Sequence, residues 1–477
     1  MSGTTVTVKW TDRSTTEDSF VLMRRESGQT YPVNRFERAT TSRSGSGQTY
    51  TATDTIPAGT RHCYTIQNYD YAGIVGGNLS NEVCTSALPA VPAPALGVGI
   101  ASSLDPAAFS GQANSTTIGA DGLGITVSYK GDGALGTGLR VSHCEDTECT
   151  SATSNTLDLP SRGISGHNPS IKIGSDGLPL ISYISLMLNG VCTEDLKVAH
   201  CVDVVCSSAT VTTVDSASRV GGNTSLVIGK DGLGMIAYNH NKKAIKVAKC
   251  QNVACTSATT RDVEVVGANG QQFLTKVSMA ASPTGLTYLA YLEDGQGSPD
   301  NLKMATLNDD GTGYSNWTLA ITEGFSHSVT IGRDGLALVS YVDQNASFGS
   351  DLTVAHCLNY TCTVSTKNVL DSGGSIFRHG NTSISLGADG FGVISYQDST
   401  SKNLVVAHCN NSACSTASHG TLLDEFGDVG AHTSMAIGSD GLPLVSYYDR
   451  TNDNLKVAHC ADAACAEPLI APFFKQK

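Results

Sequence analysis

One pattern of apolar and polar positions returns along most of the chain. In its last copy the alternating segment 434–437 (S-M-A-I) leads through Asp440-Gly441 into the apolar segment 443–449, and a third segment follows at 454–460. Alternation with a period of two predicts short β-strands, and no copy has the 3.6-residue period of an amphipathic helix. The Asp-Gly step predicts a tight hairpin, because glycine adopts the positive φ that such turns need.

The pattern occurs seven times. Each copy has four predicted strands: one before the turn glycine, one ending in Ser-Tyr or its equivalent, one of the type Leu-Lys-Val-Ala-His-Cys, and a fourth such as 365–371. Four antiparallel strands repeated at roughly this period are typical of β-propellers, and closing the ring covers the end faces of an open stack. We therefore expect an all-β fold with a seven-bladed β-propeller. Its turn glycines are Gly122, Gly177, Gly232, Gly285, Gly335, Gly390 and Gly441.

Two segments could close this ring. Residues 97–105 resemble the fourth strands that end in Leu-Asp, such as Thr156–Asp158, and they precede the first complete copy. Residues 468–474 are the alternative at the other end. We expect the N-terminal segment to complete the last blade, which makes the propeller span 97–477.

Cysteine spacing predicts both disulfides and a compartment. Twelve of the fifteen cysteines form six C-x4-C pairs at the turn between the third and fourth strands, where two facing side chains can be bridged. Such density indicates an oxidising environment, so we expect an exported protein, extracellular or at the cell surface. Met1–Gly3 lead directly into a strand pattern, and we expect an export signal upstream of this sequence. The expected pairs are Cys144 with Cys149, Cys201 with Cys206, Cys250 with Cys255, Cys357 with Cys362, Cys409 with Cys414, and Cys460 with Cys465.

Zinc is the alternative for these cysteines, because a histidine precedes the first cysteine in five copies. A structural zinc site needs four convergent ligands, whereas one copy offers three. We therefore predict disulfides and no metal. The fourth copy lacks the pair and has Thr306 and the run 308–311 instead, and Cys192 is left as an odd cysteine on a long loop.

The N-terminal segment has a different pattern. It contains T-V-K-W-T-D at 7–12, F-V-L-M-R-R at 20–25, A-G-T-R-H-C-Y-T-I at 58–66 and S-N-E-V-C at 80–84. Because of these motifs, the segment 1–88 resembles a bacterial fibronectin type III domain, and this resemblance implies a β-sandwich.

Alternation in this module places Cys63 and Cys84 on the outer faces of neighbouring strands, so we expect a disulfide between them. The segment departs from the family in two ways: it lacks the usual first strand before Thr4, and His62 replaces a tyrosine. Residues 89–96 are rich in Ala and Pro and predict a semi-rigid linker.

Composition limits the partners. Acidic residues outnumber basic ones by 43 to 30, giving a net charge of −13, which disfavours nucleic acid and anionic membrane surfaces. No segment approaches the roughly 20 apolar residues of a membrane-spanning helix, so we expect no membrane insertion.

Candidate ligand contacts lie on the loops after Ser-Tyr and on those that enter the first strands, because these loops vary and carry polar groups. The alternative is that the acidic members close turns through side-chain to backbone hydrogen bonds. The tyrosine of each second strand is interpreted as packing. The acidic candidates are Glu293, Asp343, Asp398 and Asp449, and those near the central channel are His167, Asn223, His379 and His432.

We expect an adhesion or binding protein that holds a polar partner, either a glycan or a surface protein. We expect no cofactor, and Ca²⁺ is the one cation to consider. One alternative is a structural subunit that pairs with copies of itself by strand exchange. The other is an extracellular glycan hydrolase or lyase. No G-x-S-x-G, H-E-x-x-H or phosphate-loop motif is present, so we expect no enzyme. The turn G-S-D-G-L-P resembles the Asp-box of sialidases but lacks its aromatic residue.

Overall fold

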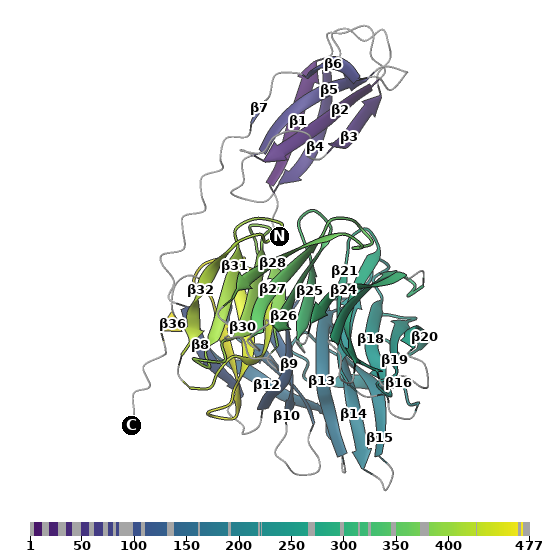
Figure 1. Ribbon diagram of the computed structural model, residues 1–477, viewed down its shortest axis with the longest axis vertical. Helices are drawn as coiled ribbons and strands as arrows, with labels where there is room; N and C mark the ends of the chain where they lie inside the picture. The colour runs from purple at the N-terminus through teal and green to yellow at the C-terminus, as the bar shows by residue number, and fades with distance from the viewer. Residues whose placement is uncertain are drawn as a thin grey trace. The chain divides into compact units, whose positions relative to one another are not determined.

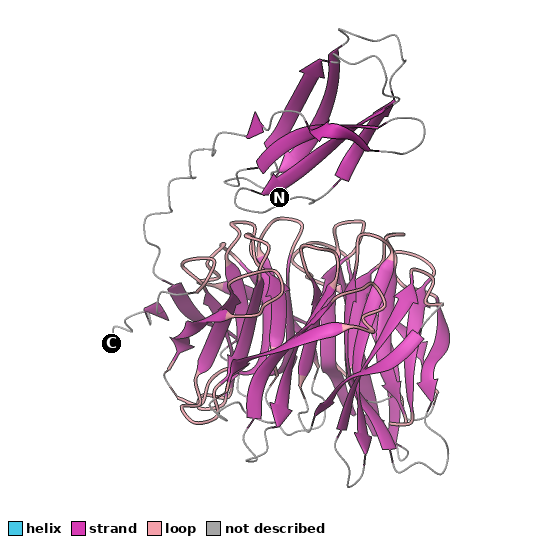
Figure 2. Ribbon diagram, turned by 45° about the horizontal axis from the view of Figure 1, so that its top comes forward, coloured by secondary structure: helices cyan, strands magenta, loops and turns pink. Residues whose placement is uncertain are grey.

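In a computed structural model the chain forms two compact units, 1–97 and 98–477, built from strands (Figures 1 and 2). Among the described residues, no helix is long and apolar enough to cross a membrane. The structure describes residues 4–11, 19–26, 35–40, 49–56, 62–69, 75–79, 83–84, 99–105, 110–130, 138–160, 163–188, 192–217, 220, 222–265, 272–295, 300–312, 315–322, 326–344, 350–372, 381–425, 427–465 and 469–470.

The N-terminal unit contains two sheets. The first pairs β1 (Thr4–Thr11) with β4 (Thr49–Ile56), and Cys63 lies opposite Cys84 in the second. The Cys63 and Cys84 side chains and the linker 89–96 lie outside the described residues, so that disulfide and the fibronectin-like assignment stay predictions. The second sheet consists of β3 (Arg35–Thr40), β2 (Ser19–Glu26), β5 (His62–Tyr69), β6 (Val75–Leu79) and, beside β5, β7 (Val83–Cys84).

The larger unit is a seven-bladed β-propeller, as the repeat predicts. Blades 1 to 6 are each an antiparallel four-stranded sheet whose strands follow chain order from the axis outward. Blades 1 to 3 are β9 (Ser110–Ile118), β10 (Gly124–Lys130), β11 (Leu139–Cys144) and β12 (Ala152–Asp158); β13 (Gly163–Ile173), β14 (Pro179–Leu188), β15 (Cys192–Cys201) and β16 (Ala209–Asp215); β17 (Thr224–Ile228), β18 (Gly234–His240), β19 (Ala244–Cys250) and β20 (Ala258–Val265).

Blades 4 to 6 repeat this order, and blade 7 supplies three strands of its own. They are β21 (Gln272–Ala281), β22 (Leu286–Gly295), β23 (Asp300–Asn308) and β24 (Ser315–Thr322); β25 (His327–Ile331), β26 (Ala337–Gln344), β27 (Ser350–Cys357) and β28 (Ser365–Asp371); β29 (Ser383–Leu386), β30 (Gly392–Gln397), β31 (Leu404–Cys409) and β32 (Ala417–Asp424); β33 (Ala431–Ile437), β34 (Pro443–Asp449) and β35 (Asn454–His459).

The N-terminal strand closes the ring. β8 (Gly99–Asp105) pairs antiparallel with β35 and completes blade 7, which confirms the expectation for 97–105. The alternative segment contributes as well, since β36 (Leu469–Ile470) lies parallel to β8 on its other side. Blade 7 is therefore a five-stranded sheet that joins both ends of the unit.

A belt of seven serines joins the inner strands around the axis. In each blade one serine hydroxyl accepts a hydrogen bond from a backbone N–H of the next inner strand, at 2.9 to 3.3 Å. The bond from Thr116 to Ser434 links blade 1 back to blade 7 and completes the circle. The members of this serine belt are Ser115, Ser170, Ser225, Ser278, Ser328, Ser383 and Ser434.

A second set of contacts joins neighbouring blades further from the axis. The Tyr183 hydroxyl of blade 2 donates to Asp158 of blade 1 at 2.9 Å, and Lys197 reaches the same carboxylate at 3.1 Å. Burial and the Asp158 charge raise the pKa of Tyr183, so its hydroxyl stays a donor. Six of the seven repeated tyrosines are buried, as their interpretation as packing residues predicts, and Tyr129 in blade 1 is half-buried. We call such a tyrosine–carboxylate hydrogen bond between neighbouring blades a latch. The equivalent latches are Tyr238–Asp215, Tyr291–Glu264, Tyr396–Asp371 and Tyr447–Asp424.

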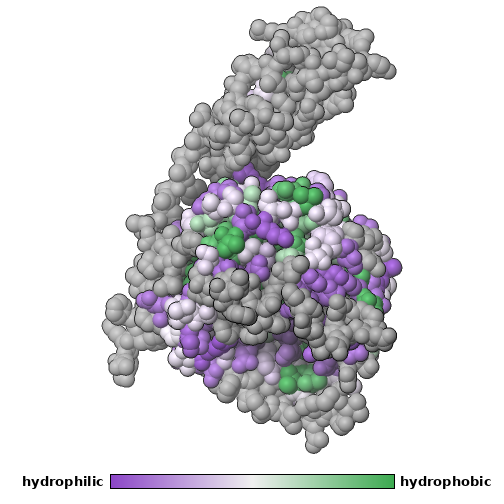
Figure 3. Space-filling view, in the orientation of Figure 1, coloured by the Kyte–Doolittle hydropathy of each residue, from purple (hydrophilic) through white to green (hydrophobic). Residues whose placement is uncertain are grey.

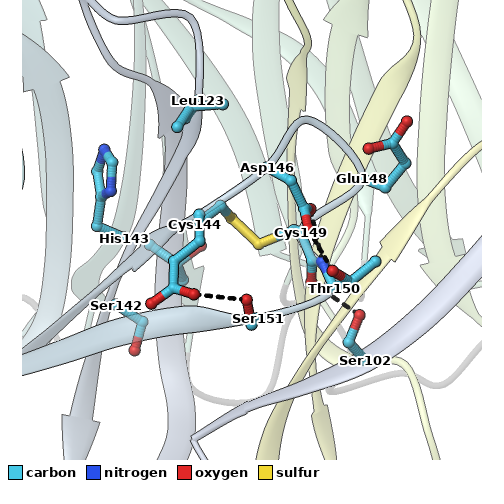
Figure 4. The surroundings of a disulfide bond; sticks show 12 residues. Ser102, Leu123, Ser142, His143, Cys144, Asp146, Glu148, Cys149, Thr150 and Ser151 are labelled. Carbon is cyan, nitrogen blue, oxygen red and sulfur yellow. Dashed lines mark hydrogen bonds between the residues drawn. A yellow bond between two sulfur atoms is a disulfide. The ribbon is translucent and has the colours of Figure 1, made fainter.

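The end of the propeller with the Asp-Gly and cysteine turns is called the turn face. All six predicted C-x4-C disulfides are present there, and Figure 4 shows the first of them. The second cysteine of each pair has a positive φ of 51 to 57°, which lets the short turn bring the sulfurs together. Six disulfides indicate an oxidising compartment. The bridges join Cys144 to Cys149, Cys201 to Cys206, Cys250 to Cys255, Cys357 to Cys362, Cys409 to Cys414, and Cys460 to Cys465.

These bridges decide between the two interpretations of the cysteines. Both sulfurs of each pair are bonded to each other, and all twelve cysteine side chains are buried in the cores between blades. In every pair the second cysteine itself has the left-handed backbone conformation, as Cys149 does in the first pair. The others are Cys206, Cys255, Cys362, Cys414 and Cys465. The expectation of disulfides rather than zinc ligands is confirmed for all six pairs.

The histidines before these cysteines contact the turn carboxylates. In five blades Nε2 lies 2.7 to 2.9 Å from the Asp of the Asp-Gly turn, as for His459 and Asp440, and Lys249 pairs with Asp231 in blade 3. The other Asp oxygen accepts the N–H two residues later, as from Leu442. No group of His, Cys, Asp and Glu in the described part of the chain could hold a metal ion.

Candidate ligand site at the mouth of the central channel

A channel runs along the axis and widens into two cavities on either side of the serine belt. The cavity toward the variable loops has a volume of about 170 Å³, and the one toward the turn face about 570 Å³. Six belt serines line both cavities, so the belt is their common boundary. We call the smaller cavity the mouth and the larger one the lower chamber.

The position two residues before the belt serine is equivalent in all seven blades, and in six of them its residue lines the mouth. At four of these positions φ is positive, between 40 and 52°, and the pairing with the second strand shifts register there. Such a bulge turns a side chain away from the strand's normal alternation, which places varied polar groups around the opening. The six lining residues are Ala113, Asn168, Asn223, Lys276, Ser326 and Asn381, and His432 holds the same position in blade 7.

Lys276 is the one cation that lines the mouth among the described residues, and none of these lining residues is acidic. Its ammonium group donates to Oδ1 of Asn381, two blades away, at 3.3 Å. Burial lowers the pKa of Lys276 from 10.5 to about 8. At neutral pH the mouth therefore holds a desolvated positive charge whose hydrogen-bond acceptor is an uncharged amide.

Two histidines near Lys276, the buried His327 and the half-buried His432, are neutral at pH 7. Burial, with Lys276 nearby, lowers the pKa of His327 and of His432 to about 4 each. Nε2 of His327 donates to the Ala290 carbonyl at 3.1 Å, and its Nδ1 is buried without a partner among the described residues. These imidazoles therefore offer acceptor nitrogens rather than charge.

Asparagine side chains hold the bulges in place. The Asn114 amide nitrogen donates to the Gly111 carbonyl at 3.0 Å and to the His432 carbonyl at 2.6 Å, which ties blade 1 to blade 7. Asn168 donates in the same way to Gly222 of blade 3 at 2.9 Å. The mouth is thus a fixed ring of amide, hydroxyl and imidazole groups around one ammonium group.

The four acidic candidates lie away from both cavities. Asp398 accepts the N–H of Thr400 and Ser401, and Asp449, 1% exposed, accepts those of the two residues after Arg450. These are the turn-closing bonds of the alternative interpretation. Glu293 accepts from the Asn301 amide and faces Lys303 at 3.8 Å, while Asp343 lies near the end of β26. Their role as ligand contacts stays a prediction.

The candidates near the channel fare differently. Asn223 lines the mouth, whereas His432 holds the equivalent position in blade 7 but is not one of the lining residues. His167 precedes Asn168, with its ring centroid 5.7 Å from that of Tyr129 and Nδ1 3.0 Å from the Asn168 amide. His379 lies outside the described residues. Sequence reasoning missed Lys276. Counting two residues back from the belt serine in every copy would have marked it as the one charged residue at that position.

Comparisons with known proteins give the fold. No described protein family and no curated protein matches the sequence. Among solved structures the chain is similar to a polysaccharide lyase, an ulvan lyase bound to -[GlcA(1-4)Rha3S]-, at 8% identity and a TM-score of 0.53 over 74% of this chain and 94% of that one.

Two further structures match at lower scores. The α-L-arabinofuranosidase of Fusarium graminearum in complex with arabinobiose matches at 9% identity and a TM-score of 0.48, over 76% of this chain and 97% of that one. An α-L-arabinanase of Penicillium chrysogenum matches at 10% and 0.46, over 78% and 99%. Identities this low speak to fold alone. The larger unit of this chain is a seven-bladed β-propeller.

Proposed function

We propose that the protein is an extracellular binding protein whose propeller holds an acidic glycan at the mouth of the central channel. The observation that carries this proposal is Lys276, a buried ammonium group with no carboxylate among the described residues lining the mouth. A carboxylate or sulfate of the ligand would supply the missing counter-charge, and charge-assisted hydrogen bonds are the stronger ones.

The surrounding groups suit a sugar. Amide and hydroxyl side chains pair with hydroxyls of a glycan, and the asparagine bonds between blades hold them before the ligand arrives, which reduces the ordering cost of binding. The described surface seen in Figure 3 is largely hydrophilic, with small separate hydrophobic areas. The fibronectin-like module at 1–88 would act as a spacer between the propeller and the cell surface.

The test is a calorimetric titration of the whole chain with matched acidic and neutral oligosaccharides. We expect uronate-containing or sulfated ligands to bind and their neutral counterparts to bind at least roughly tenfold more weakly, a difference of about 1.4 kcal/mol. Lys276→Met should remove this preference. Lys230→Met is the matched control, because Lys230 is an exposed lysine at the Asp-Gly turn of blade 3. Equal binding of acidic and neutral sugars, or unchanged affinity in Lys276→Met, would refute the proposal.

A lyase is the second candidate, and the neutral imidazoles favour it. His327 and His432 can accept a proton near a bound uronate whose carboxylate faces Lys276. Transfer of the proton from the carbon next to the carboxylate to an imidazole would leave an electron pair that forms a carbon–carbon double bond as the glycosidic C–O bond on the next carbon breaks. The imidazolium or water would then protonate the leaving oxygen, giving a hydroxyl group and an unsaturated uronate. The ulvan lyase that shares this fold was solved with a glucuronate-containing ligand. Appearance of the ultraviolet absorbance of an unsaturated uronate, and its loss in His432→Gln, would replace binding by catalysis.

The two remaining alternatives have less support. A glycan hydrolase of the usual kind needs a pair of carboxyl groups, and the described lining of the mouth contains none. Assembly by strand exchange would use the C-terminal segment, but β36 pairs with β8 of the same chain. Size-exclusion chromatography with light scattering over a range of concentrations tests assembly directly.

A further inference from the structure

Lys172 extends into the channel on the opposite side of the serine belt from Lys276. It lies on β13, where Ser170 belongs to the belt, Ile171 is fully buried in the core between blades, and Lys172 again faces the axis. This alternation is what a strand with one channel face and one core face requires. The lysine therefore points into the lower chamber because of its position in the strand.

The lower chamber has the chemistry of an anion site. Lys172 is its one charged residue among the described lining, and there is no Asp or Glu in that lining. Thr117 and Thr330 occupy the same level on other blades. The belt serines accept backbone N–H groups, so their own hydroxyl protons remain available as donors. A single ammonium group is thus surrounded by hydroxyl donors.

No described residue compensates the charge of Lys172. The described residues provide neither a hydrogen-bond acceptor nor an ion-pair partner for its ammonium group, and burial lowers its pKa. A buried charge without a partner is costly, and a bound ion of opposite sign removes that cost. At roughly 30 Å³ per water molecule, a chamber of about 570 Å³ has room for a small anion and its remaining water.

We propose that the lower chamber binds a small oxyanion, held by the Lys172 ammonium group and by hydroxyls of the channel wall. Sulfate and phosphate have the geometry to accept from several donors at once. A free carboxylate has the same sign of charge and the same kind of acceptor oxygens, and the experiment separates the two.

This site is distinct from the mouth. Lys276 stands two residues before the belt on blade 4 and Lys172 two residues after it on blade 2, so four residue levels separate them. At roughly 3.3 Å per residue the two levels are on the order of 13 Å apart along the axis. The inference therefore does not depend on the glycan proposal, and either site can be filled without the other.

Crystals of the whole chain soaked in sodium selenate give the direct test. We expect an anomalous difference peak in the lower chamber within hydrogen-bond reach of Nζ of Lys172, and no such peak in Lys172→Met. A peak at the mouth alone, no peak on the axis, or a lower-chamber peak that persists in Lys172→Met would overturn the proposal. A peak or its absence at Lys276 reports separately on the mouth.

Thermal unfolding at constant ionic strength separates the anion classes. Sulfate or phosphate should raise the Tm of the wild type with saturation, whereas the same concentration of acetate or glucuronate should raise it less. Lys172→Met should lose the saturable shift, and Lys172→Arg should keep it, because the guanidinium group also binds oxyanions. A larger shift with carboxylates would identify them as the ligand class in place of sulfate or phosphate. A linear, unsaturated shift that is equal in Lys172→Met would contradict any site at this position.

Discussion

The turn face and the mouth of the channel are built from the same strands, yet they differ in how they use the repeat. At the turn face most blades present the same set: a turn carboxylate, the histidine or lysine opposite it, and a disulfide. At the mouth the equivalent position holds Ala, Asn, Lys, Ser or His, according to the blade. A residue that serves each blade's own stability recurs in every blade. The departures from repetition, Lys276 and Lys172, are therefore the better guides to a ligand.

Reduction of the six disulfides should have the largest effect on the repeated end. Each bridge closes a short loop and contributes about 2 kcal/mol on the chain-entropy account, so full reduction should lower the free energy of unfolding by on the order of 10 kcal/mol. Urea unfolding with and without reductant measures this. Blade 4, whose third strand has Leu307 at the position of the first cysteine, is the internal reference. An unchanged urea midpoint after complete reduction would show that the bridges do not set the stability of the turn face.

Removal of one inter-blade latch should have the second-largest effect on the free energy of unfolding. Asp424 is 4% exposed and accepts from Tyr447 at 2.6 Å and from Lys456. Asp424→Ala leaves a lysine and a tyrosine hydroxyl without their acceptor, so we expect a loss of about 3 kcal/mol. Asp398→Ala, which removes turn-closing bonds, should cost about 1 kcal/mol. Equal losses in the two variants would mean that the latch has no special weight.

Lys276→Met should stabilise the protein, whereas substitution of a residue that repeats in most blades, such as Asp424, should destabilise it. The pKa of Lys276 is about 8 in the folded chain and 10.5 ordinarily, so the unfolded chain binds the proton more tightly between these pH values. The cost of burying the charge is complete below about pH 8 and disappears above pH 10.5. At about pH 7 the gain should be on the order of 3 kcal/mol. Chemical unfolding at neutral and at strongly alkaline pH should show the difference from wild type shrinking as pH rises; a destabilised variant would contradict it.

The histidine–aspartate pairs should give the smallest effect. Burial alone would raise the pKa of Asp440, but hydrogen bonds from His459 and the Leu442 N–H outweigh it, and the pKa lies below its ordinary value. A lowered carboxyl pKa stabilises the fold above roughly pH 4 and loses that contribution as pH falls through the folded value. His459→Gln should cost about 1 kcal/mol at about pH 6 and less at about pH 3. Unfolding midpoints across this range test it, and an effect that grows toward acid pH would reverse the assignment.

The features that repeat from blade to blade could be predicted from the sequence, whereas those that differ between blades could not. The blade count, the closing segment at 97–105 and the six disulfides follow from sequence patterns that recur from blade to blade. The ring at the mouth depends on bulges before the belt, where the two-residue alternation breaks, so the direction of Lys276 is not visible in the local pattern. Asp398 and Asp449 were ligand candidates because they lie on variable, polar loops, and in the structure both accept backbone N–H groups of their own turns.

The way β8 closes the ring has a mechanical consequence. Residues 1–97 lead directly into this strand, so tension applied through the N-terminal unit reaches the propeller along β8. The strand lies between β35, antiparallel, and β36, parallel, and a pull along its axis loads the hydrogen bonds to β35 in shear, many at once, rather than peeling them one by one. Such a load is therefore met first by the hydrogen bonds between β8 and β35, in the blade that joins both ends of the propeller.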